Sequence, residues 1–156
     1  VYTDLDHFKS FNDMYGFVRG DEVLMMTARI IVNSLRQSVG QKGFVGHVGG
    51  DDFVFMLDES LAEEVCERII QGFDAIVPNF YDPEDKERGC IHANNRAGEA
   101  ECFPLMTISL AVVHNKGAYL KHYGQASAIA SALKKAAKAK TGSCYVTDRR
   151  HYEPAT

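Results

Sequence analysis

The sequence contains no tryptophan, only four prolines and no long run of apolar residues. A helix that crosses a bilayer needs about 20 predominantly apolar residues in succession, so we expect no membrane contact by this domain. The chain also lacks an excess of positive charge, because 17 Lys and Arg stand against 21 Asp and Glu, for a formal net charge of −4. Proteins that bind many phosphates of a nucleic-acid polymer are normally basic, so we expect no such polymer as a partner.

Cysteines are few, and their spacing is not that of a ligand set. Cys66, Cys90, Cys102 and Cys144 form no C-x-x-C pair, the spacing typical of zinc sites and redox motifs. A chain of 156 residues, 46% of them apolar, can bury a core of its own and does not need disulfides for stability. We therefore expect reduced thiols and a cytoplasmic location.

The length predicts a single domain over residues 1–156. The first residue is Val1 rather than methionine, and no signal peptide is recognisable. We interpret the sequence as an N-terminally truncated fragment of a longer protein. Residues 79–104 are polar and charged, and we expect them to form a surface insertion with a small hairpin of its own.

Helical and strand patterns alternate along the chain. Apolar residues spaced three or four apart predict helices over 7–15, 21–38, 60–76 and 125–140. Ser60, followed three residues later by Glu63, is the predicted N-cap of the third helix. Runs rich in β-formers predict strands over 1–6, 44–48, 53–57, 105–113 and 143–147. The run 53–57 is apolar at every position, so we expect a strand covered by helices on both faces. The order is typical of an α/β (α+β) fold, a mixed sheet with a βααββαβ core, helices on both faces and a central Gly-Gly-Asp-Asp hairpin.

Acidic residues cluster at two places that such a sheet can bring together. Asp4 and Asp6 end the first predicted strand, and Asp51 and Asp52 occupy the hairpin turn. If that strand lies beside the hairpin, the carboxylates meet at one edge, where their mutual repulsion calls for a cation. Hard oxygen ligands suit Mg²⁺. The alternative is that the acids of the hairpin are ordinary turn residues, since Gly and Asp are common in turns.

The chain resembles GGDEF domains in two motifs. The family's opening pattern, D-[LI]-D-x-F-K-x-x-N-D-x-x-G-H-x-x-G-D, is matched at residues 4–21 by D-L-D-H-F-K-S-F-N-D-M-Y-G-F-V-R-G-D. About 28 residues further on, residues 49–53 read G-G-D-D-F where the family has G-G-[DE]-E-F. The resemblance covers most of the chain and is weakest in 79–104. The segment that the family carries upstream of its first strand is missing, which again indicates a fragment.

The resemblance implies a palm-like catalytic core, related to polymerases, that condenses two GTP molecules into cyclic di-GMP and two pyrophosphates. In two-metal chemistry the cations activate the attacking oxygen and neutralise the leaving group. Carried over to this chain, Asp4, Asp51, Asp52 and the Leu5 carbonyl would hold Mg²⁺ or Mn²⁺, and Asp51 and Asp52 would be the catalytic acids.

The resemblance also implies how GTP would be bound. Backbone N–H groups of His7, Phe8 and Lys9 would hold phosphates at a helix start, and Asn12 and Asp21 would recognise the guanine edge. Lys138 or Lys140 would stand in for the family's triphosphate-binding lysine. Each domain would carry one GTP, so catalysis implies a homodimer. A covalently linked upstream sensor or receiver domain is implied as well.

The chain departs from the family pattern at several positions. Asp52 replaces a glutamate and is shorter by one methylene, ~1.5 Å. Phe17 replaces a histidine, His47 an arginine, and Ser143 the arginine that binds the triphosphate. The family's product-inhibition motif, R-x-x-D, falls at Gly40 and Gly43, so we expect no such inhibitory site.

These departures leave several readings open. One is an active diguanylate cyclase. The other is a degenerate GGDEF module that binds GTP, or nothing, and serves as a regulatory or interaction domain. A third is the palm domain of a CRISPR-associated polymerase, which shares G-G-D-D, although the D-L-D-x-F-K run and the small size argue against it. Asp21 has an alternative of its own, as the N-cap of the helix predicted over 21–38.

Overall fold

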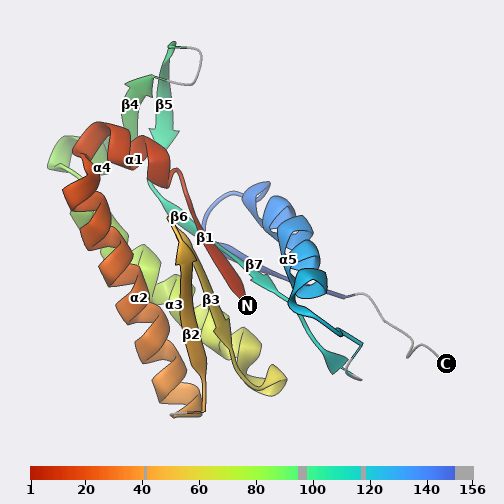
Figure 1. The fold of residues 1–156 in the computed structure, drawn as a ribbon. Coiled ribbons are helices and arrows are strands. Elements are labelled where there is room, and N and C mark those ends of the chain that lie inside the picture. Colours follow the sequence, from red (N-terminus) through yellow and green to blue (C-terminus); the bar gives the residue numbers. More distant parts are fainter. Residues whose placement is uncertain (41, 95–97, 117–118, 150–156) are drawn as a thin grey trace.

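The computed structural model describes residues 1–40, 42–94, 98–116 and 119–149 (Figure 1). Its helices and strands follow in the order β1 (Tyr2–Asp6), α1 (Phe8–Tyr15), α2 (Phe17–Val39), β2 (Phe44–Gly49), β3 (Asp52–Met56), α3 (Ala62–Ile76), α4 (Pro83–Arg88), β4 (Cys90–Asn94), β5 (Ala100–Pro104), β6 (Thr107–Val112), α5 (Tyr123–Lys138) and β7 (Cys144–Thr147). Two 3₁₀ turns, Glu59–Leu61 and Val77–Phe80, flank α3. The order contains the predicted βααββαβ core, followed by α5 and β7.

Five strands form one mixed sheet in the order β2-β3-β1-β6-β7 (Figure 1). Neighbouring strands are antiparallel, except that β6 and β7 are parallel. The mixed α/β fold class is confirmed, and the hairpin β2–β3 lies next to β1 as predicted. The hairpin occupies one side of the sheet rather than its centre, because β6 and β7 extend the sheet on the other side of β1.

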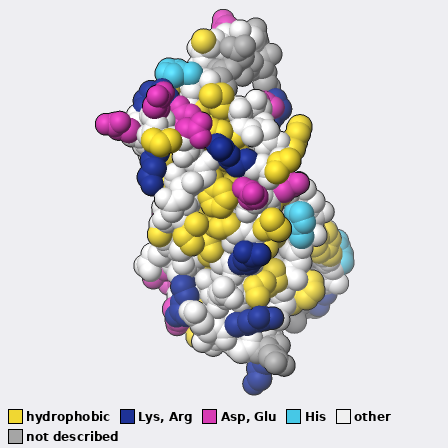
Figure 2. All heavy atoms as spheres, turned by 90° about the vertical axis from the view of Figure 1, so that its left-hand side faces the viewer, with side chains coloured by type: hydrophobic (Ala, Val, Ile, Leu, Met, Phe, Trp, Pro, Cys, Tyr) yellow, Lys and Arg dark blue, Asp and Glu magenta, His cyan; other side chains and the backbone are white. Residues whose placement is uncertain are grey.

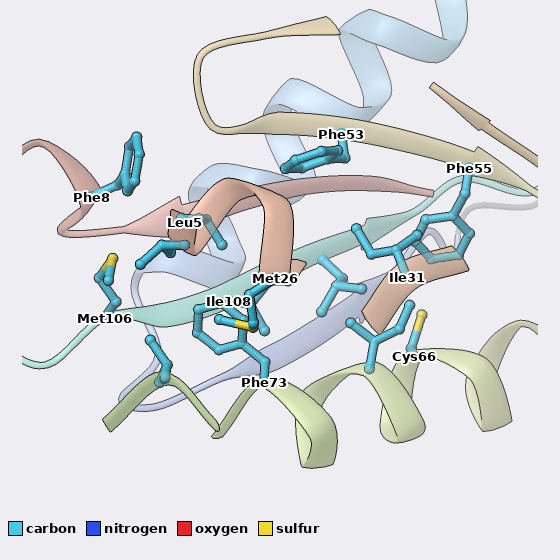
Figure 3. Close-up of a cluster of buried hydrophobic side chains, with 14 of the residues drawn as sticks. Leu5, Phe8, Met26, Ile31, Phe53, Phe55, Cys66, Phe73, Met106 and Ile108 are labelled. Atoms are coloured by element: carbon cyan, nitrogen blue, oxygen red, sulfur yellow. The ribbon is translucent and has the colours of Figure 1, made fainter. Parts of the chain in front are cut away.

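The hydrophobic core lies between the sheet and the helix pair α2 and α3. Ile31 of α2, Phe73 of α3 and Phe55 of β3 are fully buried in one cluster, which also contains Leu5 and Ile108 (Figure 3). Burial of apolar surface on this scale is the main stabilising contribution to the fold. It also fixes the position of β1 and of the hairpin relative to each other.

Strand β1 separates two environments, because successive side chains of a strand point to opposite faces. Leu5 points into the core cluster (Figure 3), whereas Asp4 contacts lysines of α5 on the other face. Helix α5 packs on β6, β7 and β1, and its Ala130 and Ala137 are buried. These small side chains let the helix approach the sheet closely, which brings its lysines to β1.

The strand that is covered on both faces is β6, not β3 as predicted. Residues 108–112 of β6 are all buried, since α3 and α5 both pack against this strand. In β3 only Phe53 and Phe55 are buried, and Met56 is 62% exposed. The apolar run 53–57 thus combines one buried face with a solvent-exposed methionine.

Residues 79–104 consist of two different parts. The first part packs into the body of the domain: Tyr81 and Asp85 are buried, and the Tyr15 hydroxyl donates a hydrogen bond to the Asp85 carboxylate. The second part is the hairpin β4–β5, a separate two-stranded sheet that projects beyond α1 and α4 (Figure 1). Its turn, residues 95–97, lies outside the described residues.

A disulfide joins Cys90 and Cys102 across this hairpin, with their Cα atoms 5.8 Å apart. The expectation of four reduced cysteines was therefore wrong for this pair. The register pairs Cys102 with His92, which puts Cys90 diagonally opposite on the neighbouring strand and within disulfide distance. Cys66, which is buried, and Cys144 are free thiols.

Two helices begin at positions other than those predicted. Helix α2 starts at Phe17, after Gly16 with φ 84°, rather than at Asp21. The turn before α3 is capped by Asp58, whose carboxylate accepts from the Ser60 N–H at 2.9 Å, rather than by Ser60. The face that carries α2 exposes hydrophobic side chains between acidic and basic groups (Figure 2).

None of the helices in the described part of the chain combines the length and apolar character that a membrane crossing requires.

Candidate functional site

The first acidic motif lies where β1 leads into α1. Asp4 is 7% exposed and faces α5. Asp6 serves the sheet instead, since its Oδ2 accepts hydrogen bonds from the hydroxyl groups of Thr107 at 2.9 Å and Ser109 at 2.7 Å on β6. Of the two acids that end β1, Asp4 is thus the one available to a functional site.

The residue between β1 and α1 has an unusual backbone. His7 adopts a left-handed conformation, φ 64° and ψ 12°, as the N-cap of α1. Its side chain is exposed, and its ring lies 6.3 Å, centroid to centroid, from that of Phe103 on β5. The first N–H groups of a helix have no partner within the helix, so the start of α1, where Phe8 and Lys9 lie, can receive an anion.

The second acidic motif lies in the β2–β3 turn, where two glycines permit the backbone conformation. Gly49 and Gly50 have φ 143° and 57°, values that side chains with a Cβ rarely adopt. The Nε2 of His47 donates to the Gly50 carbonyl at 2.8 Å, and the His47 ring stacks on Phe53 with 4.7 Å between centroids. His47 therefore stiffens the turn that carries Asp51.

Lys134 of α5 joins the two motifs and was not among the predicted site residues. Its ammonium group lies 2.9 Å from Asp4 Oδ2 and also contacts the Asp52 carboxylate. Lys138, one helical turn later, lies 2.6 Å from Asp4 Oδ1. Lysines four residues apart share one face of a helix, and this spacing was a signal that could have found Lys134.

The acids of the site differ in their tendency to ionise. Burial alone would raise the pKa of the Asp4 carboxyl, but the ammonium groups of Lys138 and Lys134 lower it below its ordinary value. Burial, followed by the negative charge of Asp4, raises the pKa of the Asp51 carboxyl. Burial alone would lower the pKa of the Lys134 ammonium group, but hydrogen bonds to Asp52 and Asp4 raise it above its ordinary value. Asp4 and Lys134 are thus a charged pair beside a more readily protonated acid.

The residues expected to bind Mg²⁺ or Mn²⁺ come to one edge of the sheet but do not surround one point. Among the described residues, no group of three or more His, Cys, Asp or Glu side chains is placed to hold an ion. Both oxygens of Asp4 and one of Asp52 are paired with lysines instead. The donors have the right chemistry for Mg²⁺, but their arrangement does not fit a preformed metal centre.

The two residues expected to recognise guanine lie on α1 and α2. Asn12 Oδ1 is buried and has no hydrogen-bond partner in the part of the chain that the structure describes. It faces Gly20, where an added Cβ would lie 1.8 Å from this oxygen. Asp21 follows Gly20 and is exposed in the second turn of α2. Because α2 begins at Phe17, Asp21 is not its N-cap, and the capping alternative is wrong.

The residues near the C-terminus that were considered for phosphate binding differ in their positions and contacts. Lys138 joins the acidic motif of β1. Lys140 lies beyond the end of α5 and is exposed, and it makes no ion pair with Asp4 or Asp52. Ser143 accepts from the Ile108 N–H at 3.0 Å and donates to a carboxylate oxygen of α3.

A cavity of about 510 Å³ opens beside the acids and lysines. Its walls include Asp4 and Asp52 together with Lys134, Lys135 and Lys138. Acids and lysines neutralise each other here, so an anionic ligand gains full attraction only when the lysines turn from the carboxylates toward it.

A family model described as "Diguanylate cyclase, GGDEF domain" matches residues 1–89, more than half of the chain. The chain belongs to the GGDEF domain family. The matched part contains both acidic motifs, Asn12 and Asp21, whereas Lys134 and Lys138 lie beyond it.

Relatives of this GGDEF domain include several diguanylate cyclases. DgcP of Pseudomonas aeruginosa is 33% identical over 105 residues, 62% of this chain and 15% of DgcP. A diguanylate cyclase of Vibrio cholerae is 34% identical over 76 residues, 47% of this chain and 22% of that protein. The probable diguanylate cyclase DgcF of Escherichia coli K12 is 48% identical over 53 residues, 34% of this chain and 16% of DgcF. The chain spans less than a quarter of the length of each of them.

Solved structures share the fold. The GGDEF domain of YfiN from Pseudomonas aeruginosa matches with a TM-score of 0.60 and 17% identity, over 96% of this chain and 81% of that one. The active GGEEF domain of a diguanylate cyclase from Vibrio cholerae gives 0.56 and 21%, again over 96% and 81%. The coiled coil and GGDEF domain of DgcB from Caulobacter crescentus, in complex with c-di-GMP, gives 0.60 and 19% over 94% and 67%.

Proposed function

We propose that this domain binds GTP and condenses two GTP molecules into cyclic di-GMP. The observation that carries the proposal is that Asp4 of β1 and Asp52 of the hairpin contact the same ammonium group. The two motifs that resemble the family's catalytic motifs therefore meet at one edge of the sheet, beside a cavity that can admit a nucleotide.

Guanine recognition is assigned to the α1–α2 corner. The carboxylate of Asp21 accepts from the guanine N1–H and amino group, which adenine does not offer, and the amide of Asn12 contributes a further hydrogen bond. The room left by Gly20 and the unpartnered buried oxygen of Asn12 support a role for this amide beyond packing.

Phosphate binding is assigned to two groups of donors. Backbone N–H groups of His7, Phe8 and Lys9 face the phosphates at the start of α1, where the helix dipole favours negative charge. The ammonium group of Lys138 binds the phosphates from the α5 side, with Lys140 as a further candidate.

In the reaction, the 3′-hydroxyl oxygen of one GTP attacks the α-phosphorus of the other. An O–P bond forms, the bond from that phosphorus to the β-phosphate oxygen breaks, and pyrophosphate leaves. In this proposal Asp51 and Asp52 are the catalytic acids, and Asp51 accepts the hydroxyl proton. Two such steps close the ring, so two domains must face each other in a homodimer. Asp4, Asp51, Asp52 and the Leu5 carbonyl would hold Mg²⁺ or Mn²⁺, which would activate the attacking oxygen and neutralise the leaving pyrophosphate.

The biological setting is part of the same proposal. The domain is a bacterial second-messenger enzyme of signal transduction, located in the cytoplasm. It is joined to an upstream sensor or receiver domain, which sets how two copies of the domain meet.

A second candidate is a GTP-binding regulatory module without turnover. Two observations favour it. Asp52, shorter than the family's glutamate, is held by Lys134, and Ser143 uses its hydroxyl in hydrogen bonds to β6 and α3 where typical members carry a phosphate-binding arginine.

The test is synthesis of cyclic di-GMP by the purified, dimeric protein from GTP with MgCl₂ or MnCl₂, measured by chromatography. The expected result is slow synthesis that Asp51→Asn abolishes. GTP binding without product in a confirmed dimer would support the regulatory module instead. Absence of both GTP binding and product would overturn both candidates.

A further inference from the structure

Helix α5 supplies two positive charges to the acidic edge of the sheet. Lys134 Nζ lies 2.9 Å from Asp4 Oδ2 and contacts Asp52 Oδ1, and Lys138 Nζ lies 2.6 Å from Asp4 Oδ1. The side chains of Asp4 and Lys134 are 10% and 20% exposed, against 45% for Lys138. The interaction of Lys134 with Asp4 is therefore the more shielded of the two from solvent.

Lys134 differs from Lys138 in one further respect, because it bridges two elements. Asp4 belongs to β1, and Asp52 begins β3 after the hairpin turn. A cation shared by carboxylates of two elements holds them together against their mutual repulsion. This is also the position that a divalent ion shared by the two acidic motifs would need.

We infer that Lys134 is a built-in cation of this site that competes with divalent metal for Asp4 and Asp52. An ion bound by Asp4 and Asp52 would need the carboxylate oxygens that now contact Lys134, so the ion and the ammonium group would exclude each other. Lys134 would therefore have to leave the acids before they could hold such an ion. This inference rests on the proposed function only in the choice of ion, Mg²⁺ or its substitute Mn²⁺.

The cavity beside the cluster has room for the displaced lysine side chain. Lys134 lines this cavity of about 510 Å³, so its side chain can turn from the carboxylates toward a ligand held there. A phosphate group in the cavity would then pair with the released ammonium group. The metal would accordingly bind weakly by itself and more tightly together with a nucleoside triphosphate.

The test measures Mn²⁺ binding without nucleotide, from the electron paramagnetic resonance signal of the free ion. Wild type is compared with Lys134→Gln and with Lys135→Gln, which removes the same charge from the next residue of the same helix. Lys135 lines the cavity but is not paired with Asp4 or Asp52. We expect Lys134→Gln to tighten Mn²⁺ binding about tenfold, the scale of losing one competing ion pair, and Lys135→Gln to leave it within about twofold.

Equal tightening by both variants would mean that only net charge matters, and it would overturn the inference. So would unchanged Mn²⁺ affinity in Lys134→Gln, or no Mn²⁺ binding in any of the three proteins.

A second measurement needs no substitution and stays informative if Lys134→Gln fails to fold. In wild type labelled with ¹⁵N-lysine and ¹³C-aspartate, Mg²⁺ should shift the side-chain signal of Lys134 and leave that of Lys135 in place. A Lys134 signal that stays in place while the Asp4 and Asp52 carboxyl signals shift would refute the competition. Neither assay contains GTP, so an inactive cyclase would still give a clear answer.

Discussion

Gly20 provides a sharp test of the α1–α2 corner, because its missing side chain makes room for Asn12. An added Cβ would lie 1.8 Å from Asn12 Oδ1 and 2.9 Å from Asn12 Cγ. In Gly20→Ala the Asn12 side chain must therefore move. Overpacking of this kind costs about 1–3 kcal/mol, and replacing glycine by alanine inside a helix returns about 1 kcal/mol. The free energy of unfolding should fall by only about 0–2 kcal/mol.

The same substitution should also weaken the binding of guanine nucleotides. One lost hydrogen bond, worth about 0.5–1.5 kcal/mol, weakens GTP binding by up to roughly tenfold. Isothermal titration calorimetry should give the same loss for Asn12→Ala, and no further loss for the double variant, because both changes remove one amide. Gly72→Ala is the matched control: it lies in α3, and its Cβ would lie 3.2 Å from Ile30 Cγ2. Unchanged GTP affinity in Gly20→Ala, or additive losses in the double variant, would refute the reasoning.

Three further predictions concern other parts of the domain. Burial and the Asp85 carboxylate raise the pKa of Tyr15 from 10 to about 12, so the stability that this hydroxyl contributes is complete below pH 10 and is lost as the pH rises toward 12. In urea unfolding from pH 9 to 12, the free energy of unfolding should decline less steeply in Tyr15→Phe than in wild type, and equal slopes would contradict this. If the site has adapted to Asp52, Asp52→Glu should change the rate of cyclic di-GMP synthesis by no more than about tenfold, whereas a gain of roughly 10²-fold would locate the defect of a degenerate domain in this side chain. Wild type should bind GTP more tightly than ATP, because guanine offers the Asp21 carboxylate an N1–H and an amino group and adenine does not, and Asp21→Ala should reduce this preference. Equal calorimetric affinities of wild type for both nucleotides would remove Asp21 from its assigned role.

Much of the fold could be predicted because its signals are local. The apolar spacing in 21–38 and the Gly-Gly pair at the hairpin each indicate one element, and the alternation of helical and strand patterns around a single hairpin suggested that β1 and the hairpin are neighbours. The position of the hairpin in the sheet could not be predicted in the same way. It depends on β6 inserting between β1 and β7, a pairing between distant segments that no local pattern encodes.

The lysines of α5 show a different limit. The family's triphosphate-binding residues correspond to the last turn of α5 and the residues that follow it, so the resemblance pointed to Lys138 and Lys140. The close approach of α5 to β1, made possible by Ala130 and Ala137, decides that Lys134 reaches the acids. Such an approach is a property of packing, and the sequence alone indicates only which lysines share a helix face.

The disulfide was missed for a related reason. Spacing alone does not say which residues of two strands lie opposite each other, and Cys90 and Cys102 meet only through the register of β4 and β5. The length and apolar content indicate that the domain can bury a core without a disulfide, but they do not exclude a disulfide inside a peripheral hairpin.

The same hairpin has a consequence for how the domain can vary in evolution. The Leu105 N–H donates to the Gly89 carbonyl at 3.3 Å, so the two ends of segment 90–104 are neighbours. The disulfide ties the strands of the hairpin to each other, not to the rest of the domain. The length of this segment can therefore change without rerouting the chain around it, since the entropy of closing a loop grows only slowly with its length. The junction between α4 and β6 is thus a natural point of insertion, at which new surface can be acquired while the acidic motifs of β1 and the β2–β3 turn stay unchanged.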